Sequence, residues 1–272
     1  MGTDSQRFHY YHADANALGG SIHRPLKKVI PAQASVSLPA AGGFTSARSG
    51  AFHFEDLASY RAASCRVSGS VDERTGDSTT LVTAVVEGLN LLDMITVERV
   101  VSQISTERPP EGCAPRVTFV GSQFIGLRIA GFPVEPVINL NLLVPSYDGP
   151  KRPWLKNAKL LKSAREQHAQ RISGEHAAPD WLVRRYGWIG SDEKIAEHGH
   201  VHASLVNGFT GTIPGKTWGH IVEIAGVGRF YFGEVSMYDH VYRLTMVRAE
   251  IGSPTGGDIS GGTTGSNGGS VG

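Results

Sequence analysis

Three histidines at alternating positions, His198, His200 and His202, form the sharpest chemical pattern in the sequence. Alternate side chains of a β-strand point to the same face, and their Cα atoms lie roughly 6.5 to 7 Å apart. Neighbouring imidazoles at that spacing can share one transition metal ion such as zinc, the single cofactor that the sequence suggests. The alternative is a solvent-facing strand start at which histidine is tolerated. Residues that could supply a further ligand are Glu197, His220, Glu223 and His240.

A basic amphipathic helix is the second candidate for binding. Apolar side chains recur every three and four residues from Trp154 to Ile172, which is helical spacing. Seven basic residues from Lys151 to Arg171 face one acidic residue, Glu166, so the local charge is about +6. Such a helix can lie against anionic lipid, nucleic acid or an acidic protein, whereas the alternative is a helix docked through its leucines with its lysines in water. The side chains expected to contact an anionic surface are Lys156, Lys159, Lys162 and Arg165.

Catalytic signatures are largely missing from the sequence. Gly121-Ser122 does not complete a nucleophile elbow, and the glycines from Gly226 to Gly233 join two predicted strands, unlike those of a dinucleotide-binding loop. Glu223 and Glu234 flank a predicted hairpin and could act as an acid–base pair, although a β surface offers such pairs freely. These observations favour a non-enzymatic protein.

The composition is that of an ordinary globular chain. Of 272 residues, 40% are hydrophobic and 19% are charged, which is enough for a packed core. The formal net charge of +1 provides no global field that would select a polyanionic partner. The two cysteines, Cys65 and Cys113, fit two buried thiols, a single disulfide, or a catalytic cysteine without a supporting motif.

The fold class follows from the stretch between Thr79 and Val144, whose pattern indicates successive β-strands. This stretch is rich in β-branched residues and is divided by glycine and proline. We predict a mainly β protein, an antiparallel β-sandwich or barrel-like body with a helical insertion and a disordered C-terminal tail. The expected tail has eight glycines in eighteen residues and almost no apolar content. The expected parts are residues 1–148 and 198–254 for the β body, 149–197 for the insertion and 255–272 for the tail.

Four stretches carry a resemblance to known proteins. They are Ala34-Ser-Val-Ser-Leu-Pro-Ala-Ala-Gly-Gly43, Leu81-Val-Thr-Ala-Val-Val-Glu-Gly-Leu-Asn-Leu-Leu92, Ile95-Thr-Val-Glu-Arg-Val-Val101 and Gly121-Ser-Gln-Phe-Ile-Gly-Leu-Arg-Ile-Ala-Gly-Phe-Pro-Val134. In this order they are similar to a group of uncharacterised bacterial proteins and, more distantly, resemble the choice-of-anchor P type of extracellular β domain. The resemblance implies a β fold and an extracellular or envelope location. The sequence itself shows no signal peptide and no window apolar enough for a membrane span, which favours the cytoplasm.

Three hypotheses for function follow from these patterns. The first is a non-enzymatic structural or binding module that associates with itself, as a homo-oligomer or filament, through exposed strand edges. The second is a metal-binding protein that uses the histidine run. The third is a protein whose basic helix binds an acidic partner or an anionic surface.

Overall fold

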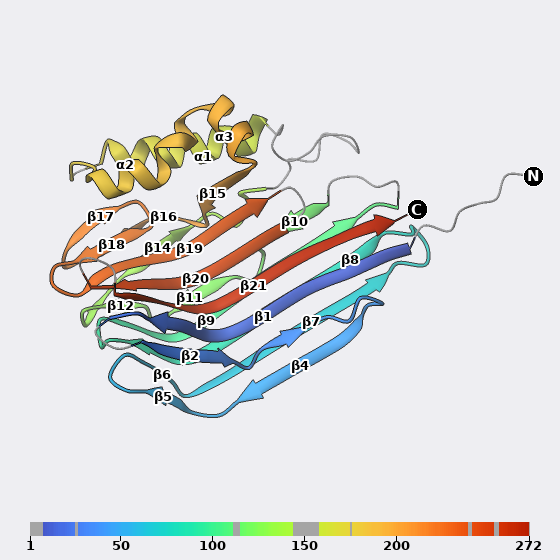
Figure 1. Ribbon diagram of the computed structural model, residues 1–272, viewed down its shortest axis with the longest axis horizontal. Coiled ribbons are helices and arrows are strands. Elements are labelled where there is room, and N and C mark those ends of the chain that lie inside the picture. Colours follow the sequence, from blue (N-terminus) through green and yellow to red (C-terminus); the bar gives the residue numbers. More distant parts are fainter. Residues whose placement is uncertain are drawn as a thin grey trace, which may run out of the picture.

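The computed structural model describes residues 8–24, 27–110, 115–143, 158–174, 176–238, 241–252 and 256–271. Two large antiparallel sheets pack face to face, and a group of helices lies against one of them (Figure 1). The predicted fold class, a mainly β antiparallel sandwich with a helical insertion, is therefore confirmed. The strands in the described part of the chain form no closed barrel.

Sheet A has nine strands and contains both ends of the described chain. Its main path runs β17-β18-β19-β20-β21-β1-β2, with β15 beside β19 and β3 beside β1. Its strands are β1 (Phe8–Ile22), β2 (Lys28–Gln33), β3 (Val36–Ser37), β15 (His200–Ser204), β17 (Lys216–Trp218), β18 (Ile221–Ile224), β19 (Gly228–Tyr238), β20 (Val241–Ile251) and β21 (Gly257–Val271).

Sheet B has ten strands and is built around the long hairpin of β8 and β9. Its main path runs β13-β12-β9-β8-β6-β5, with β10 and β11 beside β9, β7 beside β8, and β4 beside β7. Its strands are β4 (Gly43–Ser49), β5 (Phe52–Phe54), β6 (Ala58–Tyr60), β7 (Ala62–Val71), β8 (Ser78–Leu91), β9 (Ile95–Arg108), β10 (Arg116–Thr118), β11 (Gln123–Ile125), β12 (Arg128–Ile129) and β13 (Phe132–Pro133). A separate small sheet pairs β14 (Glu135–Ile138) with β16 (Val206–Thr210).

The main core lies between the two large sheets. Alternate residues of β8, among them Val82 and Ala84, are fully buried on the face that meets sheet A. The strand β1 contributes small side chains from Ala13, Ala15 and Ala17, which are also buried. Small residues on a shared strand face let the two layers approach closely.

The insertion contains α1 (Ala158–Ile172), α2 (Asp180–Tyr186), the 3-10 helix η2 (Gly187–Gly190) and α3 (Asp192–His198). These helices lie over the end of sheet A that contains β15, β17 and β18 (Figure 1). The sequence predicts that the first helix starts at Trp154, but residues 144–157 lie outside the described part, in which α1 starts at Ala158. No helix in the described part is long and apolar enough to cross a membrane.

The prediction of a disordered C-terminal tail is wrong for the described residues of that stretch. They form β21, which pairs with β1 along one side and with β20 along the other. These two neighbours supply backbone hydrogen-bond partners, so β21 needs little β-propensity of its own. Its small residues also fit a crowded position, since a Cβ on Gly257 would lie 2.5 Å from the carbonyl oxygen of Ser21. Thr264 is fully buried and its hydroxyl lies 2.8 Å from that of Ser102 in sheet B.

We therefore expect that ending the chain after Gly256 abolishes the cooperative thermal transition. The truncation leaves β1 and β20 without the strand between them and uncovers the core of sheet A. The substitution Thr264→Asp should give the same result without shortening the chain, because it places a charge between the sheets. Asp258→Asn, at an exposed position of β21, is the control. A disordered tail would instead leave the circular-dichroism melting curve of the truncated chain unchanged.

Candidate functional site

Charged and aromatic residues gather where the helices cover sheet A. In β19, Phe232 points toward sheet B, where its ring centroid lies 6.1 Å from that of Phe124. Tyr231 precedes it and therefore points to the opposite face, beneath the helices. Arg248 of β20 is the cross-strand partner of Tyr231, and Glu234 lies on the same face. We call this set the docking network; its members are Arg171, Arg185, Tyr186, Tyr231, Glu234, Arg248 and Glu250.

Arg248 lies at the centre of the docking network. Its Nε and Nη2 donate to the two carboxylate oxygens of Glu234 over 2.6 and 3.0 Å. Its Nη1 donates to Oε1 of Glu250 over 2.6 Å, while Glu250 Oε2 accepts from the Tyr231 hydroxyl over 2.7 Å. The guanidinium also lies 3.7 Å from the centroid of the Tyr231 ring. A bidentate contact of this kind neutralises the charge of the guanidinium and also fixes its orientation.

The helices complete the docking network from above. In α2, the Tyr186 hydroxyl donates to Glu234 Oε1 over 3.1 Å and Arg185 pairs with Glu250. In α1, Arg171 is only 2% exposed, and its guanidinium lies 5.1 Å from the centroid of the Tyr186 ring. The sheet carboxylates thus bind groups from α2 directly, and Arg171 brings α1 into the same cluster.

A neutral amide adds a second connection between α1 and the sheet. Gln167 is buried; its Nε2 donates to the carbonyl of Ser204 over 2.7 Å and to Oδ1 of Asn207 over 2.8 Å. Its Oε1 accepts from the backbone N–H of Ser204 over 2.9 Å. This side chain therefore satisfies backbone groups at the end of β15, where a buried unpaired group would be costly.

Burial and neighbouring charges shift the ionisation of these groups in opposite directions. Burial favours protonated Glu234, but Arg248 outweighs it and holds the pKa of this carboxyl well below its usual range. The pKa of Glu250 is also lowered, because Arg185 and Arg248 outweigh its burial. Burial instead lowers the pKa of both His202 and His220 to about 4. The carboxylates are therefore ionised and the two histidines neutral at pH 7.

This arrangement is suited to holding the helices on the sheet rather than to transferring protons. The predicted acid–base pair does not form, since Glu223 pairs with Arg229 over 3.2 Å and Glu234 pairs with Arg248. A carboxylate whose pKa is lowered by a bound guanidinium stays charged, so it is a poor general acid at neutral pH. The sequence pattern indicates Glu234 but not its partners, which lie in other segments of the chain.

The structure places the three predicted metal ligands differently from one another. His200 and His202 lie in β15, but His198 ends α3, and Gly199 with a φ of 67° turns the chain between them. The expectation of one strand face for all three is therefore wrong for His198. Ser191, which caps α3, and Gly199 after it are the helix boundary signals that the strand interpretation overlooked.

The three imidazoles nevertheless lie near one another, around Trp188. Ring centroids are 5.7 Å apart for His198 and His200, and 5.0 Å apart for His200 and His202, while the Trp188 ring lies 4.5 Å from that of His198. His202 Nδ1 already lies 2.9 Å from the Ser236 hydroxyl. In the described residues, no group of three or more His, Cys, Asp or Glu is positioned to hold a metal ion. Zinc binding by this run stays a prediction.

The other proposed ligands do not join the histidine run. Glu223 pairs with Arg229, and His220 is fully buried 3.9 Å from Glu234, which exceeds hydrogen-bond distance. Glu197 is exposed in α3, and His240 lies outside the described residues.

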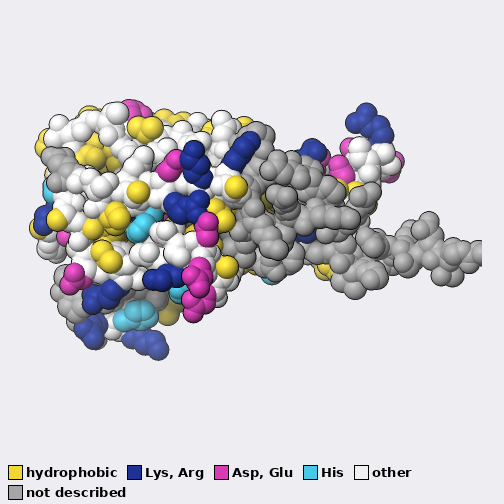
Figure 2. Space-filling view, turned by 90° about the horizontal axis from the view of Figure 1, so that it is seen from above, with side chains coloured by type: hydrophobic (Ala, Val, Ile, Leu, Met, Phe, Trp, Pro, Cys, Tyr) yellow, Lys and Arg dark blue, Asp and Glu magenta, His cyan; other side chains and the backbone are white. Residues whose placement is uncertain are grey.

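The basic helix is less basic on its surface than the sequence suggests. Arg171, which was counted in the local charge, turns inward into the docking network and adds no charge to the exposed face of the helix. Arg165 pairs with Asp192 of α3, and the exposed Lys162 lies 3.7 Å from Glu166. Lys159 is also exposed, whereas Lys156 lies outside the described residues. Seen from above, basic side chains alternate with acidic, histidine and apolar ones (Figure 2).

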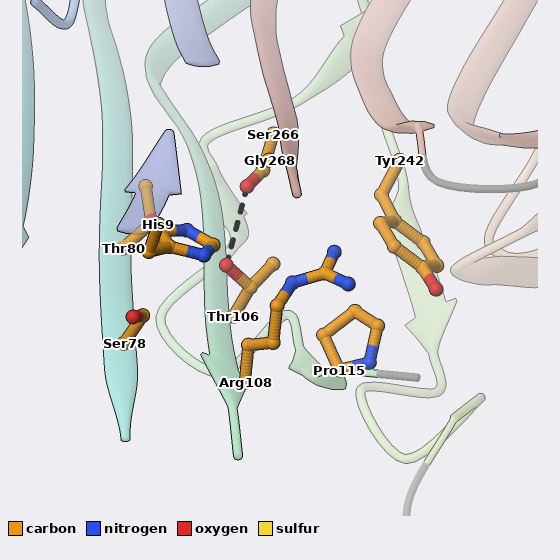
Figure 3. Close-up of a pocket in the computed structure, with 9 residues that line it drawn as sticks. All are labelled: His9, Ser78, Thr80, Thr106, Arg108, Pro115, Tyr242, Ser266 and Gly268. Carbon is orange, nitrogen blue, oxygen red and sulfur yellow. Dashed lines mark hydrogen bonds between the residues drawn. The ribbon is translucent and has the colours of Figure 1, made fainter. Parts of the chain in front are cut away.

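A small polar cavity of about 10 Å³ lies between the sheets near the C-terminal end of β21 (Figure 3). Thr106 and Ser266 join across it through hydroxyl groups 3.2 Å apart, and Arg108 reaches toward Tyr242. The pKa of His9 beside it is lowered by burial and by Arg108. This volume holds about one water molecule, so the cavity is a polar end of the core. It is lined by His9, Ser78, Thr80, Thr106, Arg108, Pro115, Tyr242, Ser266 and Gly268.

The cysteines supply no reactive thiol in the described part. Cys65 is free and fully buried, and burial raises the pKa of its thiol to about 12. A thiol in such surroundings is inert, which agrees with the buried-thiol interpretation. Cys113 lies outside the described residues.

We expect Glu234→Gln to lower the free energy of unfolding by about 3 to 5 kcal/mol. The substitution keeps the shape of the side chain but leaves Arg248 buried without its two-pronged partner. Glu166→Gln is the control, because Glu166 forms an exposed pair with Lys162 that contributes at most about 0.5 kcal/mol. Urea denaturation measures both variants, and equal small effects would contradict the central place of Glu234.

We expect the free energy of unfolding to fall as the pH drops from about 6.5 to about 4. His202 and His220 have a pKa of about 4 when folded and about 6.5 when unfolded, so the unfolded chain binds more protons in this window. Each histidine contributes a slope of up to about 1.4 kcal/mol per pH unit. Urea denaturation at several pH values should show a shallower slope for His220→Asn and an unchanged slope for the exposed control His12→Asn. An unchanged slope for His220→Asn would refute this assignment.

Comparison with known proteins identifies a family but no activity. A family model described as a domain of unknown function, DUF8256, matches residues 9–238. No curated protein and no solved structure matches the chain. The match extends from β1 to the end of β19, and β20 and β21 follow it in the chain. The chain therefore belongs to the DUF8256 family.

Proposed function

We propose that the protein is a non-enzymatic β module that associates with a second copy of itself through the free edge of β4. The observation that supports this proposal is that β4 pairs along all seven residues with β7 and with no other described strand. Its Phe44 is 64% exposed. The unpaired side of such a strand offers backbone donors and acceptors to another strand.

The other outer strands of the two sheets are shorter or better protected. β5, β13 and β17 have only two or three residues each. β2 is longer but contains Pro31 and begins with Lys28, two residue types that discourage edge pairing. β4 has neither proline nor lysine. Among the described strands, β4 is therefore the longest edge that contains neither proline nor lysine.

The sequence of β4 is complementary to itself in an antiparallel arrangement. Pairing centred on Ser46 places Phe44 of one copy opposite Arg48 of the other, and two-fold symmetry repeats this contact. A guanidinium facing an aromatic ring is attractive. The same register places Thr45 opposite Ala47. Such a contact is symmetric and closed, so it predicts a dimer in which two copies of sheet B become continuous.

We expect Phe44→Lys to weaken the dimer by more than about tenfold in its dissociation constant. The lysine faces Arg48 of the other copy at both symmetric positions, and like charges directly opposite each other repel. Val29→Lys on β2 is the matched control, because Val29 is 63% exposed on another edge strand. Sedimentation at several concentrations should show a dimer for the unmodified protein and the control. A monomer at every concentration, or equal dissociation of both variants, would contradict the proposal.

A further inference from the structure

An open groove of about 410 Å³ lies on the face of sheet B that is turned away from sheet A. Leu89 points inward, since its side chain approaches Gly261 of sheet A. Its neighbour Asn90 therefore points outward, and it pairs across the strands with Thr96, which in turn pairs with Arg128. The row formed by Asn90, Thr96 and Arg128 makes one wall of the groove.

Two glycines allow charged side chains to lie flat in this groove. A Cβ on Gly88 would lie 2.7 Å from Nε of Arg61, and a Cβ on Gly126 would lie 2.6 Å from the carboxyl carbon of Glu98. Both glycines also have a φ near +60°, a region that other residues rarely adopt. The site therefore depends on local backbone features that keep Arg61 and Glu98 against the sheet.

The charged groups of the groove remain available to a ligand. Among the described residues, Arg61, Arg128 and Glu98 form no ion pair. Arg128 donates one N–H to the carbonyl of Gly131 over 3.1 Å, which orients its guanidinium and leaves other donors unused. Arg61 is anchored at its own backbone, whose N–H donates to the carbonyl of Glu87 over 2.8 Å.

A second open groove of about 270 Å³ lies on the same sheet, closer to β4. Arg48 and Arg66 line it together with Ser64 and Glu87. Glu87 connects the two grooves, since its carbonyl accepts the backbone N–H of Arg61, and its cross-strand partner Arg99 is exposed. The charged residues of the two grooves, together with Arg99, form what we call the charged strip. It contains five arginines, and its two glutamates lie between them. Its charged residues are Arg48, Arg61, Arg66, Arg99, Arg128, Glu87 and Glu98.

This mixture of charges favours one class of ligand. Guanidinium groups bind carboxylates through paired hydrogen bonds, while serine, threonine and carboxylate side chains bind hydroxyl groups. A single-stranded nucleic acid carries a phosphate at every nucleotide and is usually held by aromatic stacking. The glutamates would repel phosphates, which offer them no hydrogen-bond donor, and no aromatic residue among those described lines either groove. A polymer that carries carboxylates together with many hydroxyl donors fits the strip better.

We propose that the Arg61–Arg128 groove and the strip that continues it bind an acidic polysaccharide through its carboxylate and hydroxyl groups. The Arg61–Arg128 groove lies away from the free edge of β4, and Arg48 alone belongs both to the strip and to the proposed dimer contact. The two proposals can therefore fail independently. Loss of the dimer in Phe44→Lys should leave the effect of Arg61→Gln/Arg128→Gln on polysaccharide binding unchanged.

Calorimetric titration of the full chain with polygalacturonate tests the proposal, with neutral dextran and oligo-dT as the comparison ligands. We expect binding of polygalacturonate and none of dextran. The double variant Arg61→Gln/Arg128→Gln should bind at least about tenfold more weakly, because two charge-assisted contacts are lost. Arg243→Gln, at an exposed position of sheet A, is the matched control and should bind normally.

Glu98→Gln separates a built site from general attraction between charges. If Glu98 accepts hydrogen bonds from sugar hydroxyls, its removal weakens binding or leaves it unchanged. If the strip only attracts negative charge, the same substitution strengthens binding, and this result would overturn the proposal. The proposal would also be overturned by an absence of polygalacturonate binding, by tighter binding of oligo-dT, or by an equal loss in Arg243→Gln.

Discussion

The guanidinium of Arg248, held between the carboxylates of Glu234 and Glu250, is the interaction on which the helical side of the molecule depends. Besides buried leucine and isoleucine side chains, the docking face of these helices contains Arg171, which has almost no contact with solvent. Buried charges are tolerated only when they are paired and hydrogen-bonded. The two glutamates meet this requirement for Arg248, and they also bind Tyr186 and Arg185 of α2.

The docking network requires an intact sheet A, because its residues are aligned by strand pairing. β20 carries Arg248 and Glu250, and it is held between β19 and the glycine-rich β21. Near the network, Gly233 of β19 and Met246 of β20 are left out of the strand pairing. Because of this irregularity, Glu234 lies on the face of sheet A that the helices cover. Loss of β21 would therefore affect the helices as well as the core. Sheet B presents its free edge and its charged strip away from this region, which separates helix docking from the two proposed binding surfaces.

The sequence predicted those features that depend on neighbouring residues. Enrichment in β-branched residues identified the strands β8 and β9, the glycines from Gly226 to Gly233 indicated the hairpin of β18 and β19, and three-to-four spacing identified α1. The docking network escaped prediction because Arg171, Glu234 and Arg248 are far apart in the chain and meet only through strand register. The C-terminal tail was predicted to be disordered from its composition alone. In the structure, β21 is stabilised by backbone hydrogen bonds to the strands on both sides, which composition does not reveal. The charged strip was missed for the same reason, since Arg61 lies against Gly88 only in the folded sheet.

Hydrogen exchange of Glu234→Gln, compared with the unmodified protein and Glu166→Gln, tests the docking role most directly. Backbone amides report local opening segment by segment. We expect α1 and α2 to lose protection first in Glu234→Gln, while β8 and β9 in sheet B keep theirs and Glu166→Gln resembles the unmodified protein. Unchanged protection of α1 and α2 in Glu234→Gln would contradict the claim that this carboxylate holds the helices on the sheet.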